Sequence, residues 1–115
     1  MNKIETIYKI LLKEFKEQGW WPLFNHKANK IEYYPKDYSY PKTEEEKFEI
    51  CIGAILTQNT AWKNVEKAIN NLKQNNALNI NLIIELKEKE LALLIKSSGY
   101  HNQKAKKLKK FSEFY

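Results

Sequence analysis

The sequence is poor in the residues that build turns and cross-links. Its 115 residues include one cysteine, three glycines and three prolines. A single cysteine excludes a disulfide framework, and with no second cysteine it is too little for a zinc or iron–sulfur site. So few turn residues argue against a loop-rich β-sandwich or a collagen-like chain and favour long helices.

Long apolar runs are also missing. No stretch approaches the roughly 20 apolar residues that a membrane-spanning helix needs. The apolar stretch near the N-terminus is interrupted by Lys9, Lys13 and Glu14, which differs from a signal peptide. Hydrophobic residues make up 43% of the chain and charged residues 30%, a balance typical of a globular domain. We therefore expect a cytoplasmic protein that makes no membrane contact.

Arginine is absent, and the charge is carried by lysine alone. All 20 basic residues are lysine, and the net charge is +6. Lysine attracts anions without the bidentate geometry of a guanidinium group. AT-rich codon usage explains the missing arginine, whereas the net charge is explained equally by codon usage and by a phosphate backbone or another acidic partner.

The spacing of apolar residues predicts an all-α fold of five or six helices without internal repeats. The first helix is expected at 3–18. The second begins at Thr43, because Thr43 and Glu46 form a capping-box pattern, and it continues to 58. The remaining helices are expected at 61–75, 79–86, 88–97 and 102–115.

Residues 20–42 differ from the rest of the chain. All three prolines and four of the seven tyrosines lie there. A connection of this length is unusual in a compact domain unless it is ordered. We expect its aromatic side chains to pack on the domain surface, with a short extended piece at 31–34.

The segment LTQNT, at 56–60, places two amide side chains at a tight turn between two predicted helices. Asn59 and Thr60 are good N-cap residues, so capping of the following helix accounts for them. Gln58 is neither a typical cap nor apolar. An amide with two donors and an acceptor, held on a rigid turn, suits insertion into a polar gap.

The three tryptophans lie close to predicted turns. Trp20 and Trp21 precede Pro22, and Trp62 follows the 56–60 turn. Ordinary packing is the simpler interpretation of these side chains. The alternative is an aromatic box, because flat rings stack on nucleobases and bind a positively charged base more strongly.

A glycine turn precedes the last predicted helix. A helix N-terminus at Gly99 and Tyr100 can hold a phosphate, while a solvated basic face explains the pattern equally well. The helix carries five lysines, namely Lys104, Lys106, Lys107, Lys109 and Lys110. His26 and His101 lack metal-ligand spacing to Cys51, so we expect no metal site and a buried, apolar role for Cys51.

Together these segments resemble the N-terminal half of the helix-hairpin-helix (HhH-GPD) DNA glycosylase superfamily. The similarity is to endonuclease III-like proteins and, among them, to the 3-methyladenine DNA glycosylase branch. It rests on GAILTQNTAWKNVEKAINNL, preceded by WWP and KFE and followed by LIKSSGYHNQKAKKLKKF. It covers 1–24 and 43–115, whereas 25–42 looks like an insertion, for which a DNA-contacting loop is the alternative to surface packing.

The resemblance implies a fold, a mechanism and roles for residues. Residues 1–115 would be a partial glycosylase domain, divided into a first helix (1–19), an aromatic loop (20–42) and helices of a six-helix barrel (43–115). Such enzymes flip a damaged, in this branch alkylated, base out of double-stranded DNA and cleave its N-glycosidic bond. The implied base pocket is Trp20, Trp21 and Trp62. The implied DNA-inserting and DNA-contacting residues are Gln58, Asn59, Gly99, Tyr100, Lys104 and Lys107.

The resemblance also implies what to expect beyond this segment. In the family, the hairpin, the catalytic aspartate, the lysine of the lyase branch and any iron–sulfur cysteines follow the helix that ends here. We therefore expect no catalytic residue and no cofactor in this chain. Where a member of the family has an iron–sulfur cluster, its C-terminal half would hold it. Half a barrel leaves an apolar face uncovered, which predicts a complementary C-terminal polypeptide or self-association. The alternatives are a non-catalytic basic DNA-binding remnant and a helical protein-interaction module.

Overall fold

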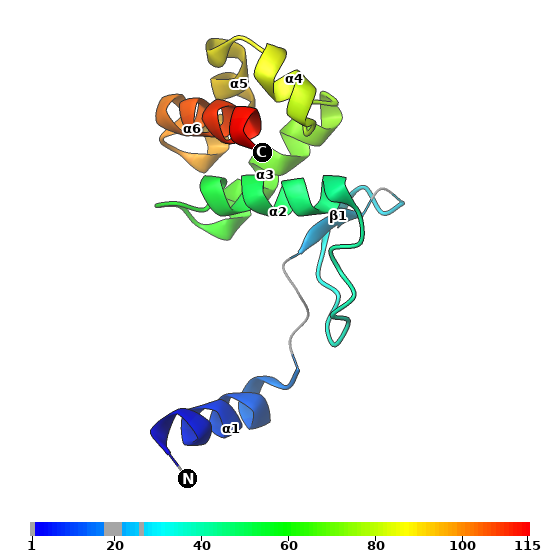
Figure 1. Cartoon of the computed structure of the whole chain (residues 1–115), viewed down its shortest axis with the longest axis vertical. Coiled ribbons are helices and arrows are strands. Elements are labelled where there is room, and N and C mark those ends of the chain that lie inside the picture. Colours follow the sequence, from blue (N-terminus) through cyan, green and yellow to red (C-terminus); the bar gives the residue numbers. More distant parts are fainter. Residues whose placement is uncertain (1, 18–21, 26) are drawn as a thin grey trace.

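The computed structural model describes residues 2–17, 22–25 and 27–115, and nearly all of its regular structure is helical (Figure 1). This confirms the all-α fold class. The helices are α1 (Lys3–Phe15), α2 (Glu44–Leu56), α3 (Trp62–Gln74), α4 (Ile80–Glu85), α5 (Glu88–Leu94) and α6 (His101–Phe114), with a 3-10 turn, η1 (Lys96–Ser98), before α6.

The core lies between α2, α3, α5 and α6. Phe48, Ile52 and Leu56 of α2 are at most 2% exposed and share one cluster with apolar side chains of the other helices. Burial of each such side chain contributes about 1.5–3 kcal/mol. The partners of α2 in this cluster include Val65, Ala68, Ile69, Leu72, Leu91, Ala92, Ala105 and Leu108. These are largely the apolar positions that the 3.6-residue period predicts.

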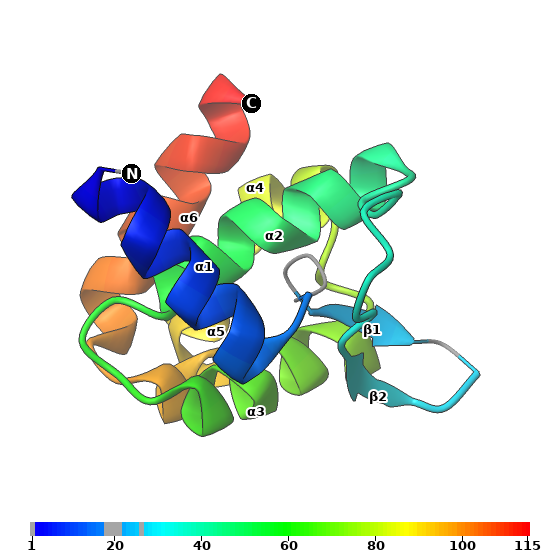
Figure 2. The same ribbon diagram turned by 90° about the horizontal axis from the view of Figure 1, so that it is seen from below.

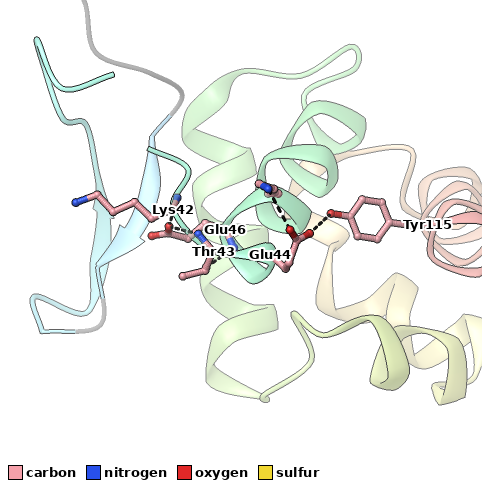
Figure 3. Close-up of polar contacts among 6 residues, drawn as sticks. Lys42, Thr43, Glu44, Glu46 and Tyr115 are labelled. Atoms are coloured by element: carbon pink, nitrogen blue, oxygen red, sulfur yellow. Dashed lines mark hydrogen bonds and ion pairs between the residues drawn. The ribbon is translucent and has the colours of Figure 1, made fainter. Parts of the chain in front are cut away.

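The start of α2 carries the predicted capping box (Figure 3). The Thr43 hydroxyl accepts a hydrogen bond from the Glu46 amide at 3.1 Å, and a Glu46 carboxylate oxygen accepts from the Thr43 amide at 3.1 Å and from the Lys42 amide at 2.7 Å. Glu44 accepts from the Tyr115 hydroxyl at 3.4 Å. The end of α6 is thereby linked to the start of α2.

The predicted cap of α3 is wrong. The N-cap of α3 is Ala61, which makes no side-chain capping bond. The Thr60 hydroxyl instead accepts a hydrogen bond from the Asn64 side-chain amide at 3.3 Å. Asn59 has a left-handed backbone with φ of 57°, so the chain turns at Asn59 before the helix begins.

The aromatic segment contains a short antiparallel hairpin. Strands β1 (Leu23–Asn25) and β2 (Lys30–Glu32) pair with Leu23 opposite Glu32. The extended piece predicted at 31–34 overlaps β2, whereas β1 was not predicted, because three residues are too few to show a strand period. The hairpin lies against α2 and α3, as Figure 2 shows from below.

The carboxylate of Glu49 links this hairpin to the helices. Its side chain is buried, accepts a hydrogen bond from the Phe24 amide at 2.8 Å and lies 3.4 Å from the Lys73 ammonium. Burial raises the pKa of Glu49, and the Phe24 amide and the Lys73 charge act against that rise. A charged side chain at an otherwise apolar helix position thus connects β1, α2 and α3.

Helix α1 lies apart from the rest of the molecule (Figure 1). It confirms the first predicted helix but ends at Phe15, and it contains no buried residue. Its apolar stripe is therefore open to solvent over Ile4, Ile7, Tyr8, Leu11 and Phe15, each at least half exposed. A helix with one apolar face gains stability chiefly by packing that face, so most of the apolar surface of α1 remains exposed for a further contact.

Candidate nucleic-acid interface

Two turns meet at one side of the helical body. The turn between α2 and α3 and the start of α6 together line a small cavity of about 70 Å³. Its lining residues are Gln58, Asn59, Tyr100, Gln103, Lys104 and Lys107. Five of the six residues expected to contact DNA are therefore brought together, although the two that precede α3 lie more than 40 positions before the three at the start of α6.

The backbone at both turns is in the left-handed region. Asn59 has φ of 57°, Gly99 of 72° and Tyr100 of 48°. A Cβ atom at Gly99 would meet nothing within 4 Å, so the backbone angle alone favours glycine there. A left-handed tyrosine is uncommon, and its side chain is 61% exposed beside the cavity.

Lys104 departs from the expectation of a DNA contact. Its side chain is buried, with 2% exposure, and its ammonium donates to the Leu56 carbonyl at 2.8 Å and to the Ser98 carbonyl at 2.7 Å. Burial lowers the pKa of Lys104, and the nearby Lys107 charge lowers it further. Lys104 thus joins the end of α2 to η1 and does not present its charge to solvent.

Lys107 is exposed, and it contacts the turn directly. Its ammonium donates to the Gln58 side-chain oxygen at 2.9 Å. Lys107 lies one helical turn after Lys104, so both lysines of this face of α6 reach toward the α2–α3 turn. The two residues singled out from separate motifs, Gln58 and Lys107, are hydrogen-bonded to each other.

The other lysines of α6 are divided between two roles. Lys109 donates to the Ile83 and Ile84 carbonyls at 3.0 and 2.8 Å, near the end of α4. Lys106 and Lys110 are exposed.

The N-terminus of α6 has no side-chain cap at Tyr100, so first-turn amides are available for an anion.

Sequence reasoning missed Gln103, which lines the same cavity. Its position is three residues after Tyr100 and four before Lys107, the spacing at which side chains share a helix face. That spacing could have identified it. Gln103 adds a second exposed amide beside Gln58.

The predicted base pocket is described only in part. Trp62 is half-buried and packs against the core at the start of α3, directly after the turn. Trp20 and Trp21 lie outside the described residues, so the three-tryptophan pocket stays a prediction. His26 also lies outside them, and Cys51 is half-buried rather than fully buried.

The part of the chain that the structure describes has neither a metal-binding cluster nor a membrane-spanning helix. Across 2–17, 22–25 and 27–115, no group of three or more His, Cys, Asp or Glu side chains is placed to hold a metal ion. Within the same ranges, no helix has both the length and the apolar content needed to cross a membrane.

The segment that carries the cavity matches a known family. Residues 52–115 match the model of the HhH-GPD superfamily of base excision DNA repair proteins. The chain belongs to the HhH-GPD superfamily. The match begins within α2 and runs through α6, so it includes both turns and every residue that lines the cavity.

Two known proteins are similar to this HhH-GPD chain. A Methanocaldococcus jannaschii protein named as a DNA repair glycosylase is 41% identical over 116 residues, which cover 98% of this chain and 43% of that protein. The crystal structure of Helicobacter pylori 3-methyladenine DNA glycosylase (MagIII) bound to 1,N6-ethenoadenine is similar with a TM-score of 0.55 and 37% identity. That similarity covers 58% of this chain and 34% of the H. pylori chain. This HhH-GPD chain therefore spans less than half the length of the relatives it matches.

Proposed function

We propose that this chain supplies the DNA-recognition part of a base excision DNA glycosylase that acts on alkylated bases in double-stranded DNA. The observation that carries the proposal is the meeting of the 56–60 turn with the uncapped, lysine-bearing start of α6 at one cavity. The similarity to a DNA repair glycosylase and to a 3-methyladenine DNA glycosylase supports the substrate class. We place this activity in the cytoplasm.

Each group has a chemical role in this proposal. Gln58, on the rigid turn, fills the space that a flipped base leaves in the duplex. The amides at the start of α6 and the exposed Lys107 attract the phosphate backbone, which lysine does without sequence preference. Asn59 and Tyr100 shape the two turns, since both have a left-handed backbone.

The base pocket in this proposal relies on stacking. An alkylated purine carries positive charge and is already a good leaving group, so its removal needs little acid catalysis. Aromatic rings bind such a cation through their faces. Trp62, together with Trp20 and Trp21, would provide these rings. We assign no catalytic residue to this chain and expect no efficient excision by it alone.

A polypeptide partner is the second part of the proposal. The apolar stripe of α1 is exposed, and so are Leu93 and Phe114, at 67% and 89%. Isolated exposed apolar residues are common, but a contiguous exposed apolar stripe along a helix marks an interaction surface. We propose that a complementary polypeptide, corresponding to the remaining length of the relatives, or a second copy of the chain covers it.

DNA binding by the purified chain tests the proposal. Affinity is measured for an intact duplex and for the same duplex with a tetrahydrofuran abasic site, over a range of salt concentrations. We expect tighter binding to the abasic duplex and loss of that preference in Gln58→Ala. Equal binding to both duplexes would favour a non-catalytic DNA-binding protein, and no binding at low salt would favour a protein-interaction module.

A further inference from the structure

The hydrogen bond between Lys107 and Gln58 has a direction that chemistry fixes. An ammonium group only donates, so the Gln58 atom 2.9 Å from it has to be the side-chain oxygen and not the nitrogen. The amide nitrogen then forms the other branch of the side chain. Gln58 is exposed, and its nitrogen makes no hydrogen bond with a described residue.

The backbone that carries Lys107 and Gln58 is held in place by Lys104. Lys104, one helical turn earlier on α6, donates to the Leu56 carbonyl, two residues before Gln58. It also donates to the Ser98 carbonyl, two residues before Tyr100. A buried, twice hydrogen-bonded ammonium therefore fixes the separation of α6 from the 56–60 turn. At this separation the Lys107 ammonium lies within hydrogen-bonding distance of the Gln58 side chain.

We propose that Lys107 is a positioning residue that orients Gln58, with the amide nitrogen directed away from the protein toward the gap left by a flipped base. This inference rests on the proposed function. A nitrogen directed in this way donates to acceptor atoms of the unpaired base opposite the gap. Thymine, the natural partner of a damaged adenine, offers O2 and O4 as acceptors.

Two roles for Lys107 make different predictions. As a phosphate contact, Lys107 would add affinity for any duplex, as any exposed lysine on α6 would. As a positioning residue, it would act on the preference for the gap and on the discrimination between opposing bases. Lys106 is the matched control, because it is the adjacent exposed lysine of the same helix and has no such contact with Gln58.

The first experiment compares the full 115-residue chain with Lys107→Met, Lys106→Met and Lys107→Arg. Each protein is titrated with an intact duplex and with abasic duplexes that carry each of the four bases opposite the tetrahydrofuran site. Both methionine variants should lose affinity for the intact duplex, because each removes one positive charge from α6. Only Lys107→Met should also lose preference for the abasic duplexes, and the loss should be largest with thymine opposite the site. We expect a loss of about two- to fivefold, because an exposed charged contact contributes free energy in that range. Lys107→Arg should keep the preference for abasic duplexes, because the guanidinium group can also donate to the Gln58 oxygen. Equal losses in both methionine variants on every duplex would overturn the proposal.

The second experiment needs no DNA. Nitrogen-15 relaxation of the Gln58 side-chain amide reports its motion in the free protein. We expect a restricted amide in wild type and Lys106→Met and a mobile one in Lys107→Met. An amide equally mobile in all three would refute the positioning role. A wild-type chain without abasic preference would refute the proposed function, and the relaxation result would still decide whether Lys107 orients Gln58.

Discussion

At the scale of single residues, the two least ordinary side chains are buried charges. Lys104 and Glu49 occupy helix positions that face the core, and each is satisfied by groups from other elements. Burying a charge costs free energy unless it is hydrogen-bonded, and removing one partner then leaves the others unsatisfied. Both residues are therefore connections between elements, at 2% and 3% exposure.

Replacing Lys104 should destabilise the protein strongly. Lys104→Ala leaves the Leu56 and Ser98 carbonyls without their donor in a buried region. We expect a loss of about 2–4 kcal/mol in the free energy of unfolding, measured by urea denaturation. Lys106→Ala, on the exposed side of α6, should change it by less than about 0.5 kcal/mol. A Lys104→Ala protein as stable as Lys106→Ala would contradict the assigned contacts.

Glu49 should make stability depend on pH. Its pKa is raised in the folded state, chiefly by burial, so the folded protein binds the proton more tightly than the unfolded chain. Its contribution to stability is complete below its ordinary pKa of 4.5 and is lost as the pH rises through the raised value. Relative to wild type, Glu49→Gln should therefore gain free energy of unfolding as the pH rises through that range. A flat difference between Glu49→Gln and wild type across that range would argue against the raised pKa.

At the scale of elements, periodicity predicted the helices well because apolar spacing reflects burial on one side. The starts of α2 and α4 were readable from Thr43 and Asn79, whose side chains cap the helices. The sequence could not reveal that Ala61 would precede α3 without a capping bond. It also could not reveal that Lys104 faces carbonyls, because a lysine between apolar positions looks the same whether water or backbone surrounds its ammonium.

The capping box of α2 should have a measurable effect. Thr43→Ala removes the acceptor of the Glu46 amide hydrogen bond and one half of the reciprocal pair. The expected loss is about 1 kcal/mol in the free energy of unfolding. Thr6→Ala is the control, since Thr6 lies in α1, apart from the core. Equal stability of the two variants in thermal unfolding would show that the cap of α2 contributes little.

At the scale of the whole molecule, the candidate site joins parts of the chain that only the fold brings together. The motifs at 56–60 and 98–107 were each recognisable in the sequence, but their hydrogen bond through Lys107 and Gln58 was not. The length of the molecule, 53 Å along its longest axis, reflects a helical body with α1 extending from it. Amphipathic spacing predicts a helix, but it does not say what covers the apolar face.

Helix α1 should therefore control association and not the stability of the body. Ile7→Ser combined with Leu11→Ser removes two exposed apolar side chains from its stripe, which are 56% and 50% exposed. If that face binds a second copy, light scattering after size-exclusion chromatography should show a larger wild-type species at high concentration and a monomeric variant. If it binds a complementary polypeptide instead, only the wild type should be retained by that polypeptide.

Lys9→Ser with Lys13→Ser, on the opposite face of α1, should behave as wild type. At a concentration where the wild type is monomeric, both double variants should unfold at the wild-type urea midpoint, because α1 buries no residue. A wild type that is monomeric at every concentration and does not bind the complementary polypeptide would refute the interaction role of α1.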